Sequence, residues 1–351
     1  DSGSRRFLVA DEVGLGKTLV AKGLIAKTVE HLWDKADRID VIYVCSNADI
    51  AAQNVARLMI PGQPAYAKAT RLTLLPLVTQ ELRANRVNFI SFTPGTTFDH
   101  GRRTGQKLER ILIYQMLESQ LGIPKKGLAR VLQANARSHW FEEIAERLSY
   151  DESIAEDFRS SLERADSDVL ERLQELSGSI ADYRRTFTGE MQRQALALIG
   201  ELRRALAKCC LDALEPDLII LDEFQRFRDL LAEPESSPSA ELANALFNHS
   251  DQLRVLLLSA TPYKMYAAHH EDENHYGDFI ATARFLLGDE ASVNDLEADL
   301  GEFRTSLLTI DADSASFGAP DASKGRIERR LKRVMCRTER VGSTAELDAM
   351  V

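Results

Sequence analysis

The sequence has few cysteines, and their spacing excludes two common uses of that residue. The four among 351 residues are Cys45, Cys209, Cys210 and Cys336. They show neither metal-ligand spacing nor a disulfide framework, so a zinc site and a disulfide-stabilised secreted domain are excluded. The chain also lacks an apolar run long enough for a membrane span and an apolar signal core near its start. We therefore predict a cytoplasmic protein, nucleoid-associated if bacterial, with no membrane partner.

An excess of positive charge is also absent. The formal net charge is −10, which excludes a chain coated for indiscriminate nucleic-acid binding but allows a local basic track. The most basic stretch is residues 324–333. It is either a phosphate-contacting helix or a solvated face in which Glu328 pairs with Lys332 or Lys324.

Short apolar, β-branched runs recur along the chain and predict the fold class. Their hydrophobicity is continuous rather than alternating, which is typical of parallel strands buried on both faces. Helical patterns follow several of them, so we predict an α/β fold with a mostly parallel sheet. The predicted strands are residues 7–10, 41–45, 72–75, 87–92, 218–221 and 255–258.

The middle of the chain has a different pattern. Residues 103–213 contain no convincing strand, and apolar residues recur there at helix spacing. We interpret this region as an α-helical insertion in the sheet domain, with an independent helical domain as the alternative. The predicted apolar helix faces include Leu108, Ile111, Leu112 and Met116, then Trp140, Phe141, Ile144 and Leu148, and later Leu196, Ile199, Leu202 and Leu206.

A glycine-rich loop follows the first predicted strand and precedes a helical pattern. It reads Asp11, Glu12, Val13, Gly14, Leu15, Gly16, Lys17, Thr18. Backbone N–H groups of such a loop can surround a phosphate, and the helix N-terminus adds a positive dipole end. Lys17 would reach the β/γ-phosphates and the Thr18 hydroxyl would hold Mg²⁺. The usual first glycine is Asp11 here, and the alternative is a glycine turn that happens to precede a helix.

Two further predicted strands end in polar residues. Residues 218–221 lead into Asp222 and Glu223, where Asp222 would hold Mg²⁺ and Glu223 would orient the attacking water. Residues 255–258 lead into Ser259 and Thr261, whose hydroxyls would couple the acidic pair to the γ-phosphate. The alternative in each case is an ordinary strand end, since Ser, Thr and acidic residues end many strands.

These three segments, in this order, resemble the motifs of superfamily 2 helicases and translocases, most closely the Swi/Snf-type DEAD/DEAH-box branch. Asp11 also stands at the position of the leading glycine in that branch, and residues 222–225 resemble the DEAD/DEAH box, ending here in Gln225. The resemblance implies a RecA-like P-loop NTPase sandwich that binds ATP and Mg²⁺. Its implied nucleotide contacts are Glu12, Val13, Gly14, Leu15, Gly16, Lys17, Thr18 and Gln225, with Lys17, Asp222 and Glu223 in catalysis.

The same resemblance implies a nucleic-acid track, with DNA favoured over RNA. Residues 92–98 are similar to a backbone-contacting loop of the branch, and residues 46–53 occupy the place of the motif before it. The implied nucleic-acid contacts are Ser46, Thr93, Gly95 and Thr96. Residues 334–341 resemble the segment that leaves the first lobe.

The implied domain organisation is a discontinuous lobe and one insertion. Residues 1–102 and 214–342 would form the ATP-binding lobe, residues 103–213 the helical insertion, and residues 343–351 the start of a linker to a second RecA-like lobe. Family members close two lobes around ATP, so we expect this polypeptide alone to hydrolyse ATP slowly if at all. The insertion is a candidate docking element for a protein partner. Two alternatives stay open: a P-loop ATPase switch that remodels protein partners without a nucleic-acid track, and an interaction protein with an inert nucleotide site.

Overall fold

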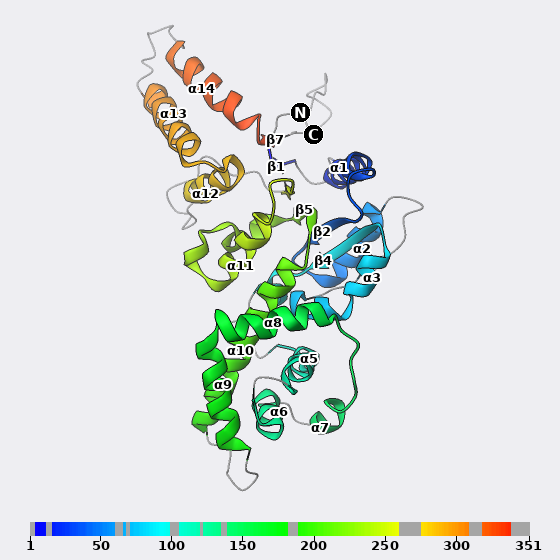
Figure 1. Cartoon of the computed structure of the whole chain (residues 1–351). Helices are drawn as coiled ribbons and strands as arrows, with labels where there is room; N and C mark the ends of the chain where they lie inside the picture. Colours follow the sequence, from blue (N-terminus) through cyan, green and yellow to red (C-terminus); the bar gives the residue numbers. More distant parts are fainter. Residues whose placement is uncertain are drawn as a thin grey trace, which may run out of the picture.

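The protein is described by a computed structural model over residues 4–11, 16–59, 66–67, 71–98, 105–119, 122–134, 139–181, 189–259, 275–308 and 318–337. Within these ranges it is a mixed α/β structure built around one parallel sheet (Figure 1). The sheet has seven strands in the order β3-β4-β2-β5-β6-β1-β7. They are β1 (Arg6–Val9), β2 (Ile39–Val44), β3 (Tyr66–Ala67), β4 (Val87–Phe92), β5 (Pro216–Asp222), β6 (Arg254–Leu258) and β7 (Met335–Cys336).

Five of the six predicted strands are confirmed, and one prediction was wrong. Residues 72–75 lie in a 3₁₀-helix, η1 (Leu72–Leu77), rather than in a strand. Pro76 within it has no N–H to give a neighbouring strand, and its fixed φ suits a helical turn. The sequence also gave no signal for β3 and β7, because two residues are too few to show a pattern.

Every strand pair in the sheet is parallel, so the carboxyl ends of the strands meet at one edge. Successive side chains of a strand point to opposite faces. In β2, Val41 and Tyr43 pack on one face with helices α1 (Lys17–Leu32) and α2 (Ala48–Leu58). Ile42 and Val44 pack on the other face. This burial on both faces explains the continuous apolar runs in the sequence.

The opposite face carries most of the remaining helices. They include α3 (Thr79–Ala84), α4 (Pro94–Thr97), η2 (Phe224–Leu231) and α11 (Pro238–Phe247), with the exposed turn η3 (Pro234–Ser236) before α11. Between β4 and β5 the chain forms α5 (Lys107–Leu117), α6 (Lys125–Gln133), α7 (Trp140–Glu143), α8 (Glu152–Arg164), α9 (Ser167–Ile180) and α10 (Gly189–Asp212). Figure 1 shows α5 to α10 gathered below the sheet.

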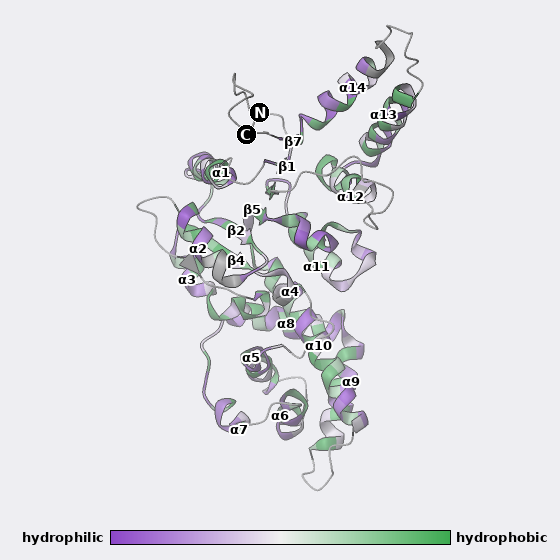
Figure 2. Cartoon of the chain, turned by 180° about the vertical axis from the view of Figure 1, so that it is seen from behind, coloured by the Kyte–Doolittle hydropathy of each residue, from purple (hydrophilic) through white to green (hydrophobic). Residues whose placement is uncertain are grey.

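The inserted helices do not have a hydrophobic core of their own. One cluster of buried side chains runs from Ile42 and Ile90 in the sheet to Leu173 and Leu206 in α9 and α10. Helix α7 is shorter than the apolar pattern suggests, and Phe141 is 46% exposed although it was placed on a buried face. The helices show hydrophobic and hydrophilic stretches together, as amphipathic packing requires (Figure 2).

A smaller group of helices follows β6. It consists of α12 (His275–Leu287), α13 (Glu290–Leu308) and α14 (Gly318–Leu331). Their shared apolar cluster includes Phe279, Val293 and Ile327. Helices α13 and α14 project away from the sheet side by side, and α14 leads into β7 (Figures 1 and 2).

Candidate active site

Strand order brings the predicted motifs to one edge of the sheet. Across that edge the structure places the segments that follow β4, β2, β5, β6 and β1 in sequence. Asp222 of β5 is in register with Leu258 of β6, which is in register with Val9 of β1. The acidic pair and the start of the glycine-rich loop are therefore two strand spacings apart, roughly 10 Å. The phosphates of a nucleotide can span a distance of this size between the two segments.

The glycine-rich loop joins β1 to α1 as the sequence predicted. Gly16 precedes the helix with φ +89°, a left-handed conformation that favours glycine. Lys17 begins α1, and its Nζ donates a hydrogen bond of 2.8 Å to the backbone oxygen of Asp11. Thr18 is exposed in the first turn. Glu12, Val13, Gly14 and Leu15 lie outside the described residues, so their predicted phosphate contacts stay predictions.

Asp222 is held by two side chains, Tyr43 and Asn54, that were not predicted to belong to the site. The Tyr43 hydroxyl donates to Asp222 Oδ2, and Asn54 Nδ2 donates to the same oxygen at 3.3 Å. Asn54 also donates to the Tyr43 hydroxyl at 3.0 Å. Tyr43 is 2% exposed, so its hydroxyl needs a partner inside the protein. A tyrosine within the apolar run 41–45 was the one signal that could have identified it.

The charge environment of Asp222 links the two walls of the site. Burial raises the pKa of Asp222 above its ordinary value, and the neighbouring charge of Glu223 raises it further. The hydrogen bond from Tyr43 and the positive charge of Lys17 lower the pKa and offset part of that increase. Lys17 therefore lies close enough to Asp222 for its charge to act on the carboxylate.

Glu223 and Gln225 follow Asp222 in a tight turn. Glu223 has φ 53° and ψ 45°, which is uncommon for a residue with a side chain. Such conformations occur often at functional sites. Gln225 Nε2 donates to Glu223 Oε2, while the buried Oε1 of Gln225 has no hydrogen-bond partner among the described residues. The turn thus holds the Glu223 carboxylate and leaves one amide oxygen of Gln225 for another donor.

The third predicted segment is described in part. Ser259 is 2% exposed, and its N–H donates to the Val9 oxygen at 3.0 Å, so it lies between the other two motifs. Thr261 lies outside the described residues.

The predicted nucleic-acid residues lie along the same edge, farther from β1. Ser46 is half-buried after β2, and Thr93 is half-buried directly before α4. Gly95 in α4 is exposed, and Thr96 is in the same helix. The ends of β2 and β4 are adjacent, with Val44 in register with Phe92. The structure therefore brings these segments together at one edge of the sheet.

Most cations of the basic stretch at residues 324–333 are paired with acids. Arg326 of α14 bonds Asp299 and Glu302 of α13 at 2.7 and 2.5 Å, and Arg330 contacts Asp295 at 3.2 Å. Glu328 pairs with both Lys332 and Lys324, at 3.2 and 3.9 Å. These contacts favour the solvated-face interpretation for the paired residues, whereas Arg333 follows α14 and forms no ion pair with a described residue.

Comparisons with known proteins add no family to these observations. No protein-family model matches the chain, and no curated protein matches it. Within the described ranges, no group of three or more His, Cys, Asp or Glu side chains could hold a metal ion. No helix in the described part of the chain is both long and apolar enough to cross a membrane. The fold and the site together define a mixed α/β protein whose parallel sheet carries the candidate site on the loops that follow the carboxyl ends of its strands.

Proposed function

We propose that this chain is the ATP-binding lobe of an ATP-dependent nucleic-acid translocase or helicase, with a RecA-like fold and DNA favoured as its track. The observation that carries the proposal is the juxtaposition of Lys17 and Asp222 across one edge of the sheet, close enough for the lysine to lower the pKa of the carboxyl. A lysine after a glycine-rich turn and an acid at the end of the strand two positions away suit a nucleotide phosphate with its metal.

The residues present fit ATP and Mg²⁺. The donor set consists of oxygen ligands, the Thr18 hydroxyl and the Asp222 carboxylate, which are the ligands Mg²⁺ prefers. One acid and one hydroxyl also suit an ion that keeps part of its water shell. When bound, Mg²⁺ would neutralise charge on the phosphates. Tyr43 and Asn54 hold Asp222 Oδ2 in a fixed direction, so the carboxylate does not have to reorient.

The roles of the remaining residues follow from their positions. Lys17 would bind the β/γ-phosphates, and Glu223 would accept a proton from the attacking water. Gln225 would hold the Glu223 carboxylate until substrate arrives, since its Nε2 donates to Glu223 Oε2. The backbone position of Ser259 between the phosphate loop and the acidic pair suits a residue that couples the two.

An exposed apolar patch supports a second lobe or a nucleotide base as a neighbour. Leu19 is 74% exposed and Val20 is 46% exposed in the first turn of α1, directly after Thr18. A second lobe that closes on the phosphate loop would cover both side chains and supply arginines to the γ-phosphate.

ATP binding by three variants of the chain tests the proposal. Lys17→Ala should abolish binding of ATP-Mg²⁺ measured by calorimetry, whereas Glu223→Gln should bind as tightly as the wild type. Lys27→Ala is the matched control, because Lys27 is an exposed lysine farther along α1. Full ATP affinity in Lys17→Ala would refute the site.

Turnover tests the motor itself. In the protein that includes a second lobe, Glu223→Gln should lose ATP hydrolysis while it retains binding. DNA should stimulate the ATPase of the wild type. Binding without any stimulation by DNA or RNA would instead favour a switch that acts on protein partners.

A further inference from the structure

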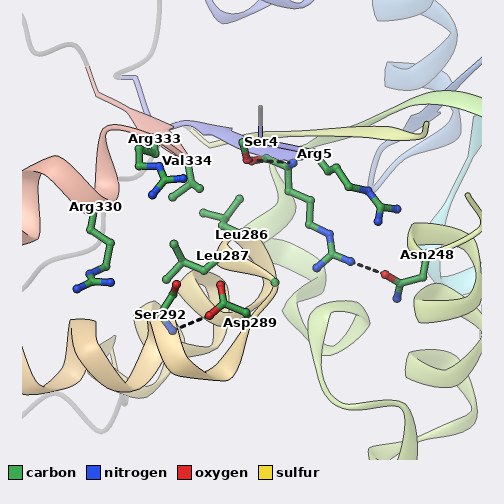
Figure 3. Close-up of a pocket in the computed structure, with 12 residues that line it drawn as sticks. Ser4, Arg5, Asn248, Leu286, Leu287, Asp289, Ser292, Arg330, Arg333 and Val334 are labelled. Atoms are coloured by element: carbon green, nitrogen blue, oxygen red, sulfur yellow. Dashed lines mark hydrogen bonds between the residues drawn. The ribbon is translucent and has the colours of Figure 1, made fainter. Parts of the chain in front are cut away.

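A cleft lined by arginines lies at the edge of the sheet opposite the candidate active site. It has a volume of about 370 Å³ and is formed by the start of β1, the junction of α12 and α13, and the segment that joins α14 to β7 (Figure 3). Arg5 and Arg6 lie at the start of β1. Arg330 lies near the end of α14, and Arg333 lies between α14 and β7. Because β1 and β7 begin at this edge, the cleft is separated from Lys17 by the length of the strands.

Arg6 is a half-buried cation whose described partners carry no negative charge. One Nη donates to the Phe285 oxygen at 2.6 Å and the other to Asn248 Oδ1 at 2.6 Å. Its guanidinium also lies 4.2 Å from the centre of the Phe285 ring. These partners are neutral, and no described carboxylate forms an ion pair with Arg6. Burial lowers the pKa of Arg6, and the positive charge of Arg5 lowers it further.

The other cations are only partly compensated. Arg5 pairs with Asp251 at 2.9 Å, but the Asp251 side chain is 95% exposed, and pairs exposed to water contribute little. Arg333 is exposed and makes no side-chain hydrogen bond or ion pair with a described residue. Arg330 is balanced by Asp295 and Asp299, which lie outside the lining.

Among the described residues, a single acid lines the cleft. Asp289 accepts a hydrogen bond of 2.7 Å from the Ser292 N–H at the start of α13, so its carboxylate is engaged by its own helix. That backbone hydrogen bond lowers the pKa of Asp289, and Arg330 and Arg333 contribute in the same direction. The lining thus holds four guanidinium groups and one carboxylate in a chain whose net charge is −10.

We infer that this cleft is an anion site that binds a phosphate group, either in a free phosphate compound or in a nucleic-acid backbone. Guanidinium groups bind phosphate oxygens through paired hydrogen bonds, and an anion would compensate the charge of Arg6. The volume admits a diphosphate but not a folded partner. The site is distinct from the proposed nucleotide site, because its residues come from the amino ends of the strands.

Binding to two probes tests the inference on the Lys17→Ala background, which removes binding at the proposed nucleotide site. Inorganic pyrophosphate is titrated by calorimetry, and a single-stranded oligonucleotide is titrated by fluorescence anisotropy. Arg333→Gln should weaken binding about tenfold, because a hydrogen bond to a charged group contributes roughly 1.5–3 kcal/mol and 1.4 kcal/mol is a factor of ten. Arg6→Gln should weaken it at least as much.

Two controls separate charge from folding. Lys324→Gln removes an exposed cation elsewhere on α14 and should leave binding unchanged. Arg333→Gln alters an exposed side chain that makes no hydrogen bond or ion pair with a described residue. Its effect on binding therefore does not come from a change in the structure of the cleft.

The outcomes of this binding experiment can be told apart from those of the ATP-binding experiment. Competition between pyrophosphate and the oligonucleotide, with both weakened by Arg333→Gln, supports a nucleic-acid backbone as the source of the phosphate. Binding of pyrophosphate alone supports a free phosphate compound. If Arg333→Gln and Arg6→Gln bind both probes like Lys324→Gln, or if neither probe binds, the inference is overturned whatever the ATP experiment shows.

Discussion

Replacement of Arg203 by methionine is expected to destabilise the protein strongly, because it removes one partner of a buried ion pair. Arg203 in α10 is 1% exposed and Glu109 in α5 is fully buried. Arg203 Nε and Nη2 donate to Glu109 Oε1 at 3.0 and 2.9 Å. Glu109 also accepts from Arg71 at 3.2 Å and from Thr73 at 2.5 Å. The network therefore joins two inserted helices to the 3₁₀-helix under the sheet.

The magnitude follows from what the variant leaves behind. Burial raises the pKa of Glu109, but Arg203 and the hydrogen bonds of Thr73 and of the Gln106 N–H outweigh it, so the pKa is lowered overall. Without Arg203 the carboxylate stays buried with Arg71 as its only described cationic partner. Loss of one member of a buried pair costs about 3–5 kcal/mol. Since Arg71 and Thr73 remain, we expect about 3 kcal/mol here.

Urea unfolding followed by circular dichroism measures this loss. The control is Arg193→Met on the same helix, where Arg193 pairs with Glu190 and is 74% exposed; there we expect less than about 1 kcal/mol. The double variant Glu109→Leu, Arg203→Met should recover much of the stability, because no unpaired charge is buried. An Arg203→Met variant as stable as Arg193→Met would refute this account of the network.

Three further predictions concern other parts of the molecule. Gly127→Ala should destabilise the protein in thermal unfolding, because a Cβ at this position would lie 1.9 Å from a backbone oxygen of α9. Gly178→Ala should instead stabilise the protein by up to about 1 kcal/mol, because a Cβ there would meet no atom within 4 Å and alanine has the better helix propensity. Burial raises the pKa of Asp217 to about 6, above its value in the unfolded chain, so the free energy of unfolding falls as pH rises through about 4 to 6. Asp217→Asn should therefore raise the unfolding midpoint at neutral pH more than at about pH 4. Tyr43→Phe removes a hydrogen bond to the charged form of Asp222, so the pKa of Asp222 should rise and ATP-Mg²⁺ binding should be lost at a higher pH than in the wild type.

Each of the three has a result that contradicts it. Equal midpoints for the two glycine variants would mean that α6 and α9 do not touch closely at Gly127. An unchanged pH dependence of stability in Asp217→Asn would remove Asp217 as its source, with Asp251→Asn, an exposed acid, as the control. A Tyr43→Phe variant that keeps the wild-type pH profile would show that its hydroxyl does not stabilise the Asp222 carboxylate.

The strand segments and the loop chemistry at their ends were predictable from the sequence. Apolar runs such as those of β4 and β6 are buried on both faces, and this burial requires continuous hydrophobicity. A helix directly after the glycine-rich loop was also expected, whereas the left-handed conformation at Gly16 was not predicted. The exception was η1, where four apolar residues form a 3₁₀-helix because tertiary packing and Pro76 outweigh strand propensity.

The buried polar partners were not predictable, because they depend on contacts between distant segments. Tyr43 is 179 residues from Asp222, and Glu109 is 94 residues from Arg203. Neither pair leaves a local pattern in the sequence. The basic residues of α14 show the same limit, since their acidic partners come from α13 and could be recognised only once the two helices lay together.

By itself the sequence determined which segments are strands and which loops carry glycine, lysine, acids and hydroxyls, because local hydrophobicity and turn chemistry are written in consecutive residues. Only the tertiary structure decided that β6 lies between β1 and β5, which places Lys17 opposite Asp222. It also decided that Arg6 is half-buried among neutral partners in the described part of the chain. The physical reason is that parallel strands can be joined by crossovers in many orders, so their neighbours are selected by the packing of the whole chain.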